Sequence, residues 1–124
     1  MKRVLHIVNL MNRGGIETYI MNVYRTIDRS KIQFDFIVNV TEECDYDDEI
    51  YSLGGKVYHI TRKRDGLFKN LRGIYKVVKE NRYNVVERHA DNSLVFLDVI
   101  AAKLGGAKKV FVHSHSNNTS LPLI

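Results

Sequence analysis

The stretch HIVNLMNRGGIETYIMNVYRTID, residues 6–28, leads from an apolar run through two adjacent glycines into a helical pattern. The run at 4–8 is apolar except for His6, which is typical of a strand buried on both faces. From Ile16 onward, apolar side chains recur at spacings of three and four and so share one face of an α-helix. The stretch predicts a strand, a glycine loop and a helix, and it raises the question of what Gly14 and Gly15 do at the junction.

The same alternation of strand and helix continues to the end of the chain. We expect further strands at 32–40, 56–60, 84–89 and 108–115, and helices over 47–55, 67–78 and 93–106, the last with Asp91, Asn92 or Ser93 as its cap and Gly105 at its end. Strands that alternate with helices imply right-handed crossovers and a parallel sheet. The sequence therefore predicts an α/β fold with a doubly wound, Rossmann-like sheet.

Length and composition fit one domain spanning 1–124. The chain has 124 residues, 44% of them hydrophobic and 27% charged, which is enough for one core and too little for two. One cysteine excludes an internal disulfide, and no apolar run approaches the roughly 20 residues of a membrane-spanning helix. The start does not continue into a signal peptide, so we expect a cytoplasmic protein. The apolar ending at 121–124 indicates a fragment of a longer chain.

The net charge of +5 is concentrated between Arg62 and Arg82. A solvated helix face is the simplest interpretation, and a surface that contacts anionic lipid headgroups is the alternative. Nucleic acid is not an expected partner, because no binding motif accompanies the basic residues.

Ligands of open parallel sheets bind beyond the carboxyl ends of the strands, where the strand order reverses. If the order is 3-2-1-4-5, the crevice opens between the first and fourth strands, and the loops at 10–15, 89–93 and 114–119 meet there. Gly14 and Gly15 would let backbone amides approach a ligand and would permit positive φ. The helix that follows offers its N-terminus to a phosphate. A tight turn without a ligand is the competing interpretation, and neither the dinucleotide fingerprint nor a P-loop is present.

Five histidines are present, and three of them fall at strand ends that face this crevice. His6 and His59 lie inside strands and are expected to be structural, whereas His89, His113 and His115 reach the crevice. Hydrogen bonds to hydroxyls or phosphates suit His89 and His115, with loop capping as the plainer alternative. Because a metal site needs three or four suitably spaced ligands, we predict no metal, and no cofactor. No nucleophile–base pair stands out.

Three segments together resemble the amino-terminal half of bacterial family 4 glycosyltransferases, GT-B enzymes of capsular and exopolysaccharide synthesis. The segments are VLHIVNLMNRGGIETYIMNVYRTID at 4–28, FDFIV at 34–38 and AAKLGGAKKVFVHSHSNNT at 101–119. The resemblance covers essentially the whole chain. It implies a retaining transferase in which two Rossmann-like domains face each other across a cleft, with the acceptor received mainly by the amino-terminal one.

The resemblance also implies roles for individual residues. The loop of Gly14 and Gly15 would lie against the diphosphate of a nucleoside-diphosphate sugar. His115 would approach the transferred sugar, with His113 as the second candidate. The family's His-x-His near the acceptor reads ERH here, so that His89 is retained and Glu87 replaces the first histidine; Asp91 follows as a further acceptor-side candidate.

The donor-binding carboxyl-terminal domain of the family has no counterpart in this chain, so we expect the 124 residues alone to bind donor weakly and to transfer nothing. Such transferases commonly work at the inner face of the membrane on a glycan or lipid-linked acceptor. Two alternatives stay open: a stand-alone module that binds a phosphorylated sugar or nucleotide sugar, and half of another GT-B enzyme such as a nucleotide-sugar epimerase.

Overall fold

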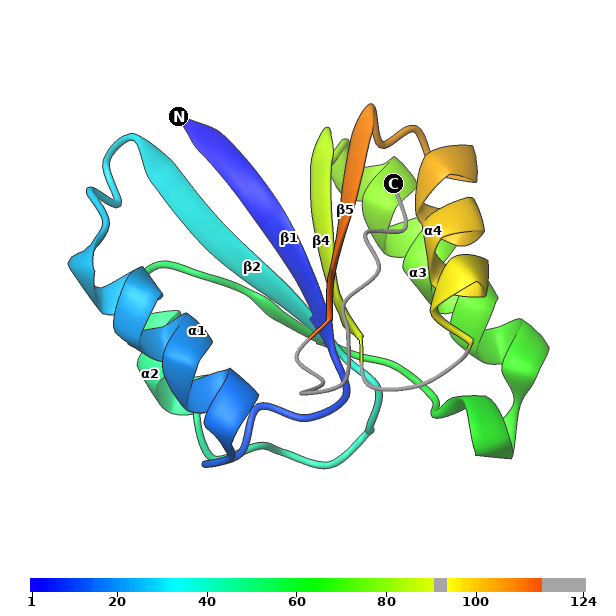
Figure 1. Ribbon diagram of the computed structural model, residues 1–124, viewed down its shortest axis with the longest axis horizontal. Helices are drawn as coiled ribbons and strands as arrows, with labels where there is room; N and C mark the ends of the chain where they lie inside the picture. The colour runs from blue at the N-terminus through cyan, green and yellow to red at the C-terminus, as the bar shows by residue number, and fades with distance from the viewer. Residues whose placement is uncertain (91–93, 115–124) are drawn as a thin grey trace.

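The computed structural model describes residues 1–90 and 94–114. Strands and helices alternate along the chain (Figure 1), and the elements are β1 (Lys2–Val8), α1 (Gly15–Thr26), β2 (Ile32–Val38), α2 (Asp47–Ser52), β3 (Val57–His59), the 3-10 helix η1 (Lys63–Asp65), α3 (Leu67–Asn81), β4 (Val85–Ala90), α4 (Val95–Leu104) and β5 (Lys109–Ser114).

The five strands form one sheet in the order β3-β2-β1-β4-β5, and every neighbouring pair is parallel. Figure 1 shows α1 and α2 on one side of the sheet and α3 and α4 on the other. The carboxyl ends of all strands therefore lie at one edge, with β1 and β4 at its centre. The predicted doubly wound, Rossmann-like fold and its strand order are confirmed.

Two cores form because successive residues of β1 point to opposite faces. Val4 and Val8 pack with side chains of α1 and α2, including Met21, Tyr24 and Ile50. Leu5 and Ile7 pack with α3 and α4 on the other face. The near-continuous apolar run at 4–8 is what a strand buried on both faces needs, so the structure explains the pattern.

A buried carboxylate holds the amino ends of the strands together. Asp35 in β2 is fully buried, pairs with Arg3 of β1 at 2.9 Å and accepts a 2.6 Å hydrogen bond from the Tyr83 hydroxyl. It also accepts a hydrogen bond from the Lys56 amide, just before β3. Burial and the bond to Asp35 raise the pKa of Tyr83 well above its ordinary value, so the phenol stays a donor.

The boundaries differ from prediction where loops take over backbone hydrogen bonds. β2 ends at Val38 because the Asn39 amide turns back to the carbonyls of Val8 and Asn9. Gly105 does cap α4, while the proposed caps Asp91, Asn92 and Ser93 lie outside the described residues. The single turn η1 was not predicted, because its sequence, KRD, carries no apolar periodicity.

Two glycines provide a matched test of this packing. A Cβ added at Gly55 would lie 2.5 Å from the Phe34 carbonyl oxygen and 2.6 Å from the Tyr24 hydroxyl, whereas one added at Gly15 would meet nothing within 4 Å. We expect Gly55→Ala to lower the free energy of unfolding by about 2 kcal/mol, as overpacking does. Gly15→Ala should change it by less than about 0.5 kcal/mol. Urea denaturation of both variants measures the difference, and equal effects would contradict this packing.

Candidate functional site

The carboxyl edge of the sheet gathers the predicted site residues that the structure describes. The loop after β1 carries Gly14 and Gly15, and β4 and β5 bring His89 and His113 to neighbouring register positions. Asp91 and His115 lie outside the described residues, so their predicted roles stay predictions.

The glycine loop does not need positive φ. Gly14 is the N-cap of α1 with an extended backbone, φ −100° and ψ −177°, and Gly15 is also absent from the positive-φ positions of the described chain. The loop therefore does not use the positive φ that glycine permits. The glycines still leave the first amides of α1 open to a ligand. Gly15 faces open space, and no side chain caps the start of α1 among the described residues.

The start of α1 presents both backbone amides, which attract an anion, and a carboxylate, which repels one. The Thr18 amide bonds the Gly14 carbonyl at 3.0 Å, which makes it the first amide bonded within the helix. Glu17 folds back so that its carboxylate oxygens would lie 2.8 and 3.0 Å from a Cβ at Gly14. Open amides at a helix N-terminus attract an anion, and the Glu17 carboxylate would have to move aside to admit one.

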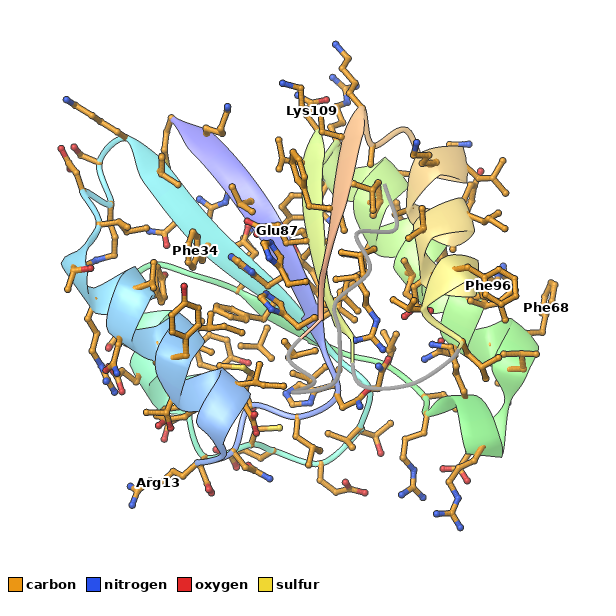
Figure 2. All side chains as sticks on the ribbon, viewed as in Figure 1. Arg13, Phe34, Phe68, Glu87, Phe96 and Lys109 are labelled. Atoms are coloured by element: carbon orange, nitrogen blue, oxygen red, sulfur yellow. The ribbon has the colours of Figure 1, made fainter. Side chains whose placement is uncertain are left out.

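A row of three histidines runs across the sheet from β1 to β5. His6 Nδ1 lies 3.0 Å from His89 Nε2, and the His89 and His113 rings stack with centroids 5.2 Å apart. His113 Nε2 lies 2.5 Å from a Glu87 carboxylate oxygen at the more exposed end of the row. Figure 2 shows Glu87 over the middle of the sheet. A carboxylate beside an imidazole orients the ring and can help it exchange a proton with a ligand hydroxyl.

The two histidines predicted to be structural differ in what they do. His59 bonds the Val40 carbonyl at 3.1 Å and pairs with Asp47 at 2.8 Å, so it ties β3 to the start of α2. His6 is buried among Phe34 and Phe36 and also reaches His89, a connection between residues 83 apart that the sequence did not reveal. Burial, followed by the nearby His89 and His113, lowers the pKa of His6 well below its ordinary value.

A buried ion triad was also missed by sequence reasoning. Arg88 in β4 and Asp98 in α4 are 1% and 0% exposed, and the Arg88 Nε donates to the Asp98 carboxylate at 2.5 Å. The other oxygen of Asp98 lies 2.6 Å from the Lys63 ammonium in η1. The available signal was Asp98 itself, a carboxylate inside the apolar run SLVFLDVIAA, because buried charges need partners.

The triad borders a pocket of about 310 Å³, here called the η1 pocket. Its walls come from the loops after β1, β2 and β3 and from β4, and the lining residues are Asn9, Leu10, Asn39, Val40, Arg62, Lys63, Arg64 and Arg88. The Asn39 amide group donates to Asn9 at 3.0 Å and accepts from Asn70 of α3 at 2.9 Å. This amide chain joins two loops of the carboxyl edge to α3.

The part of the chain that the structure describes holds neither a metal-type cluster nor a membrane-spanning helix. No group of three or more His, Cys, Asp or Glu side chains in 1–90 and 94–114 is placed to hold one ion. No helix in the same ranges has both the length and the apolar composition needed to cross a bilayer.

Comparison with known proteins identifies the family. The model of the family described as "Glycosyl transferase 4-like" matches residues 6–120. The chain belongs to this family. The resemblance to family 4 glycosyltransferases seen in the sequence is thereby confirmed.

Two relatives support this membership. The chain is 41% identical over 121 residues to "Putative glycosyltransferase EpsF" of Bacillus subtilis (strain 168), covering 96% of this chain and 31% of that protein. It is 32% identical over 92 residues to "Capsular polysaccharide biosynthesis glycosyltransferase CapH" of Staphylococcus aureus, covering 72% and 24%. The chain thus spans about a third or less of the length of these relatives.

The crystal structure of Acinetobacter baumannii MurG shares the fold. It superposes with a TM-score of 0.70 at 14% sequence identity, over 98% of this chain and 37% of that one. The predicted doubly wound domain, of the kind that forms one half of a GT-B enzyme, is therefore confirmed at the level of fold.

The depressed pKa of His6 predicts how stability depends on pH. An unfolded histidine takes up a proton near pH 6.5, whereas the buried His6 does so only at lower pH, so the unfolded state binds more protons on acidification. Stability is therefore complete above about pH 6.5 and falls below it, by up to about 1.4 kcal/mol per pH unit from this group. Denaturation of the chain and of His6→Gln between pH 7.5 and 5 measures this slope.

The variant should lose that part of the slope, while His113→Gln, at an exposed position, should keep most of it, because burial is the largest cause of the lowered His6 pKa. An unchanged slope in His6→Gln would contradict the assignment.

Proposed function

We propose that this chain is the amino-terminal, acceptor-side domain of a retaining glycosyltransferase. The parent enzyme transfers a sugar from a nucleoside-diphosphate sugar to a glycan or lipid-linked acceptor in capsular or exopolysaccharide synthesis. The donor-binding domain follows in the parent protein, and the enzyme works in the cytoplasm at the inner face of the membrane. The observation that carries the proposal is membership of the glycosyl transferase 4-like family, joined to an open glycine loop at the carboxyl edge.

The glycine loop supports contact with the donor diphosphate. Internal packing gives no reason for a glycine at position 15, because a Cβ there would meet nothing. An open approach to the first amides of α1 is the property that a diphosphate needs. We assign Gly14 and Gly15 to the donor diphosphate on this ground.

The histidine row supports a role on the sugar side. His89 and His113 lie one beside the other near the ends of β4 and β5, and Glu87 orients His113. Imidazole and carboxylate groups at such an edge bind sugar hydroxyls through hydrogen bonds. Together with His115 and Asp91, assigned from the family resemblance alone, they form the proposed sugar and acceptor site.

The two alternatives, a stand-alone binding module and half of an epimerase, predict different binding and activity from those of a transferase domain. A stand-alone binding module would bind nucleotide sugar tightly on its own, whereas half of a transferase should bind donor weakly and transfer no sugar unless its partner domain is present. An epimerase would convert the nucleotide sugar without any acceptor. The relatives EpsF and CapH, both named as glycosyltransferases, favour the transferase.

A membrane-facing surface on α3 and α4 extends the proposal. Exposed apolar side chains gather on these two helices, which pack against each other: Leu67, Phe68, Phe96, Ile100 and Leu104. Figure 2 shows Phe68 and Phe96 projecting from the outer side of the helix layer. Lys69 and Arg72 are exposed on α3, and so is Lys76, which lies 3.9 Å from the Glu80 carboxylate. Apolar anchors beside basic residues suit an anionic lipid surface. Arg62 and Lys63 pair with Asp65 and Asp98 instead, so the surface begins after η1.

A pair of substitutions at Gly15 tests the donor assignment. Gly15→Asp places a carboxylate at the N-terminus of α1, and Gly15→Asn places a neutral group of the same size there. We expect UDP and GDP to bind the 124-residue chain weakly, and Gly15→Asp to weaken binding about tenfold by repelling the diphosphate, while Gly15→Asn changes it less than about threefold. Isothermal titration calorimetry at fixed ionic strength measures both.

If the two variants bind UDP and GDP with equal affinity, the assignment of the donor diphosphate to this loop is wrong. Tight binding by the unmodified chain, with no transfer when a donor-binding domain is supplied, would favour the binding module over the transferase.

Vesicle flotation tests the surface on α3 and α4. Lys69→Gln with Arg72→Gln should weaken binding to anionic vesicles, by about fivefold for each charge removed, because each basic residue near such a surface contributes about 1 kcal/mol. Lys108→Gln with Lys109→Gln, an equal charge change at the opposite edge of the sheet, should have little effect. Equal binding to anionic and neutral vesicles would contradict the surface.

A further inference from the structure

The η1 pocket is strongly cationic for its size. Four of its eight lining residues are Arg62, Lys63, Arg64 and Arg88. Its volume of about 310 Å³ lies at the lower end of the range of roughly 300–1,000 Å³ seen for small-molecule sites. The pocket lies at the carboxyl edge of the sheet, where ligands of this fold class bind.

The carboxylates nearby do not neutralise this charge. Asp98 serves both Arg88 and Lys63, one on each oxygen, and Asp65 pairs with Arg62. Arg64 is exposed and makes no hydrogen bond or ion pair with any described residue. Four cations therefore face two carboxylates, which leaves an excess of two positive charges.

One buried guanidinium also has an unused donor at the pocket wall. Arg88 Nε donates to Asp98, and its Nη1 donates to the carbonyls of His89 and Ile7. Its Nη2 has no partner among the described residues, and it is not among their buried unpaired atoms. Because Arg88 is 1% exposed and lines the pocket, a ligand in the pocket is the partner that this nitrogen can still take.

The walls are fixed before any ligand arrives. The amide chain of Asn9, Asn39 and Asn70 joins the loops after β1 and β2 to α3, and Asn70 also donates to the Thr61 carbonyl at 2.7 Å. The triad of Arg88, Asp98 and Lys63 fixes η1 against β4 and α4. Preorganised donors of this kind lower the entropic cost of binding.

We propose that the η1 pocket binds a phosphate or diphosphate group carried by the acceptor, through Arg64 and the free Nη2 of Arg88. Arginine donors match the oxygens of a phosphate in geometry and charge. The inference deepens the proposed function and rests on it in one respect, the choice of acceptor over donor. That choice follows from position: the glycine loop leads into α1 on one face of the sheet, while η1 leads into α3 on the other. The pocket meets the glycine loop only through Asn9 and Leu10, at the start of that loop and away from Gly14 and Gly15 in sequence.

A test compares two diphosphates that differ in what they carry. Geranyl diphosphate, below its micelle concentration, stands for a lipid-linked acceptor, and UDP stands for the donor. Arg64→Gln removes one cation without breaking a described contact, and Lys109→Gln is the matched charge change at the far edge, where Figure 2 shows Lys109. Calorimetry of both ligands on the 124-residue chain gives four affinities to set beside those of the unmodified chain.

We expect Arg64→Gln to weaken geranyl diphosphate about tenfold, as loss of one charge-assisted hydrogen bond does, and to change UDP by less than about twofold. Lys109→Gln should change neither affinity by more than about twofold. The proposal is overturned if Arg64→Gln leaves geranyl diphosphate unchanged, if both variants weaken it equally, or if only UDP responds.

The same measurements distinguish a failure of the donor assignment from a failure of the pocket proposal. If Gly15→Asp leaves UDP unaffected while Arg64→Gln still weakens geranyl diphosphate, the donor assignment fails and the pocket stands. If Gly15→Asp weakens UDP and Arg64→Gln weakens nothing, the donor assignment stands and the pocket fails.

Discussion

A guanidinium that is almost wholly buried needs a counter-charge, and Arg88 has one in Asp98. Breaking such a pair by removing one partner costs about 3–5 kcal/mol, because an uncompensated charge is left in the interior. Asp98 also holds Lys63, so a single carboxylate joins β4, α4 and η1. These ion pairs hold the carboxyl edge together on this face of the sheet. Apolar packing provides the remaining contacts between the helices and the strands.

The opposite face of the sheet is organised by different chemistry. There His6, His89 and His113 form a row from the core to the more exposed Glu87–His113 pair, and α1 begins with an open glycine loop. Parallel strands bring both sets of groups to one edge because all five carboxyl ends point the same way. One edge of the domain thereby carries the open glycine loop, the histidine row and the cationic η1 pocket.

The sequence predicted what periodicity controls. The apolar run of β1, the helical spacings after Ile16 and Leu67, and the glycines near 54 and 105 determine elements through local chemistry. Alternation of strand and helix indicated the parallel sheet, and the strand order assumed for the crevice agrees with the structure. Family membership was also readable, since it depends on short motifs at fixed positions in the chain.

Contacts between distant residues were not predictable in this way. His6 and His89 are in contact although they lie 83 positions apart in the sequence. Nothing in the sequence distinguishes Arg88 and Lys63 from other charged residues, and only the fold places both beside Asp98. The positive φ that Gly14 and Gly15 permit is not used, because the loop reaches α1 through extended backbone at Gly14. A pair of glycines in a sequence therefore has two possible meanings. It can mark a turn that requires positive φ, or a surface where a ligand must come close to the backbone.

The most direct test of the account is to record backbone amide resonances of the ¹⁵N-labelled chain by nuclear magnetic resonance during a titration with UDP. The central claim is that substrate binds at the carboxyl edge through the start of α1. It predicts that the largest shifts fall on the amides of Gly14, Gly15, Ile16 and Glu17, and that β-strand residues at the amino edge, such as Lys2 and Lys109, do not move. Shifts confined to the amino edge, or none at all at millimolar UDP, would contradict it.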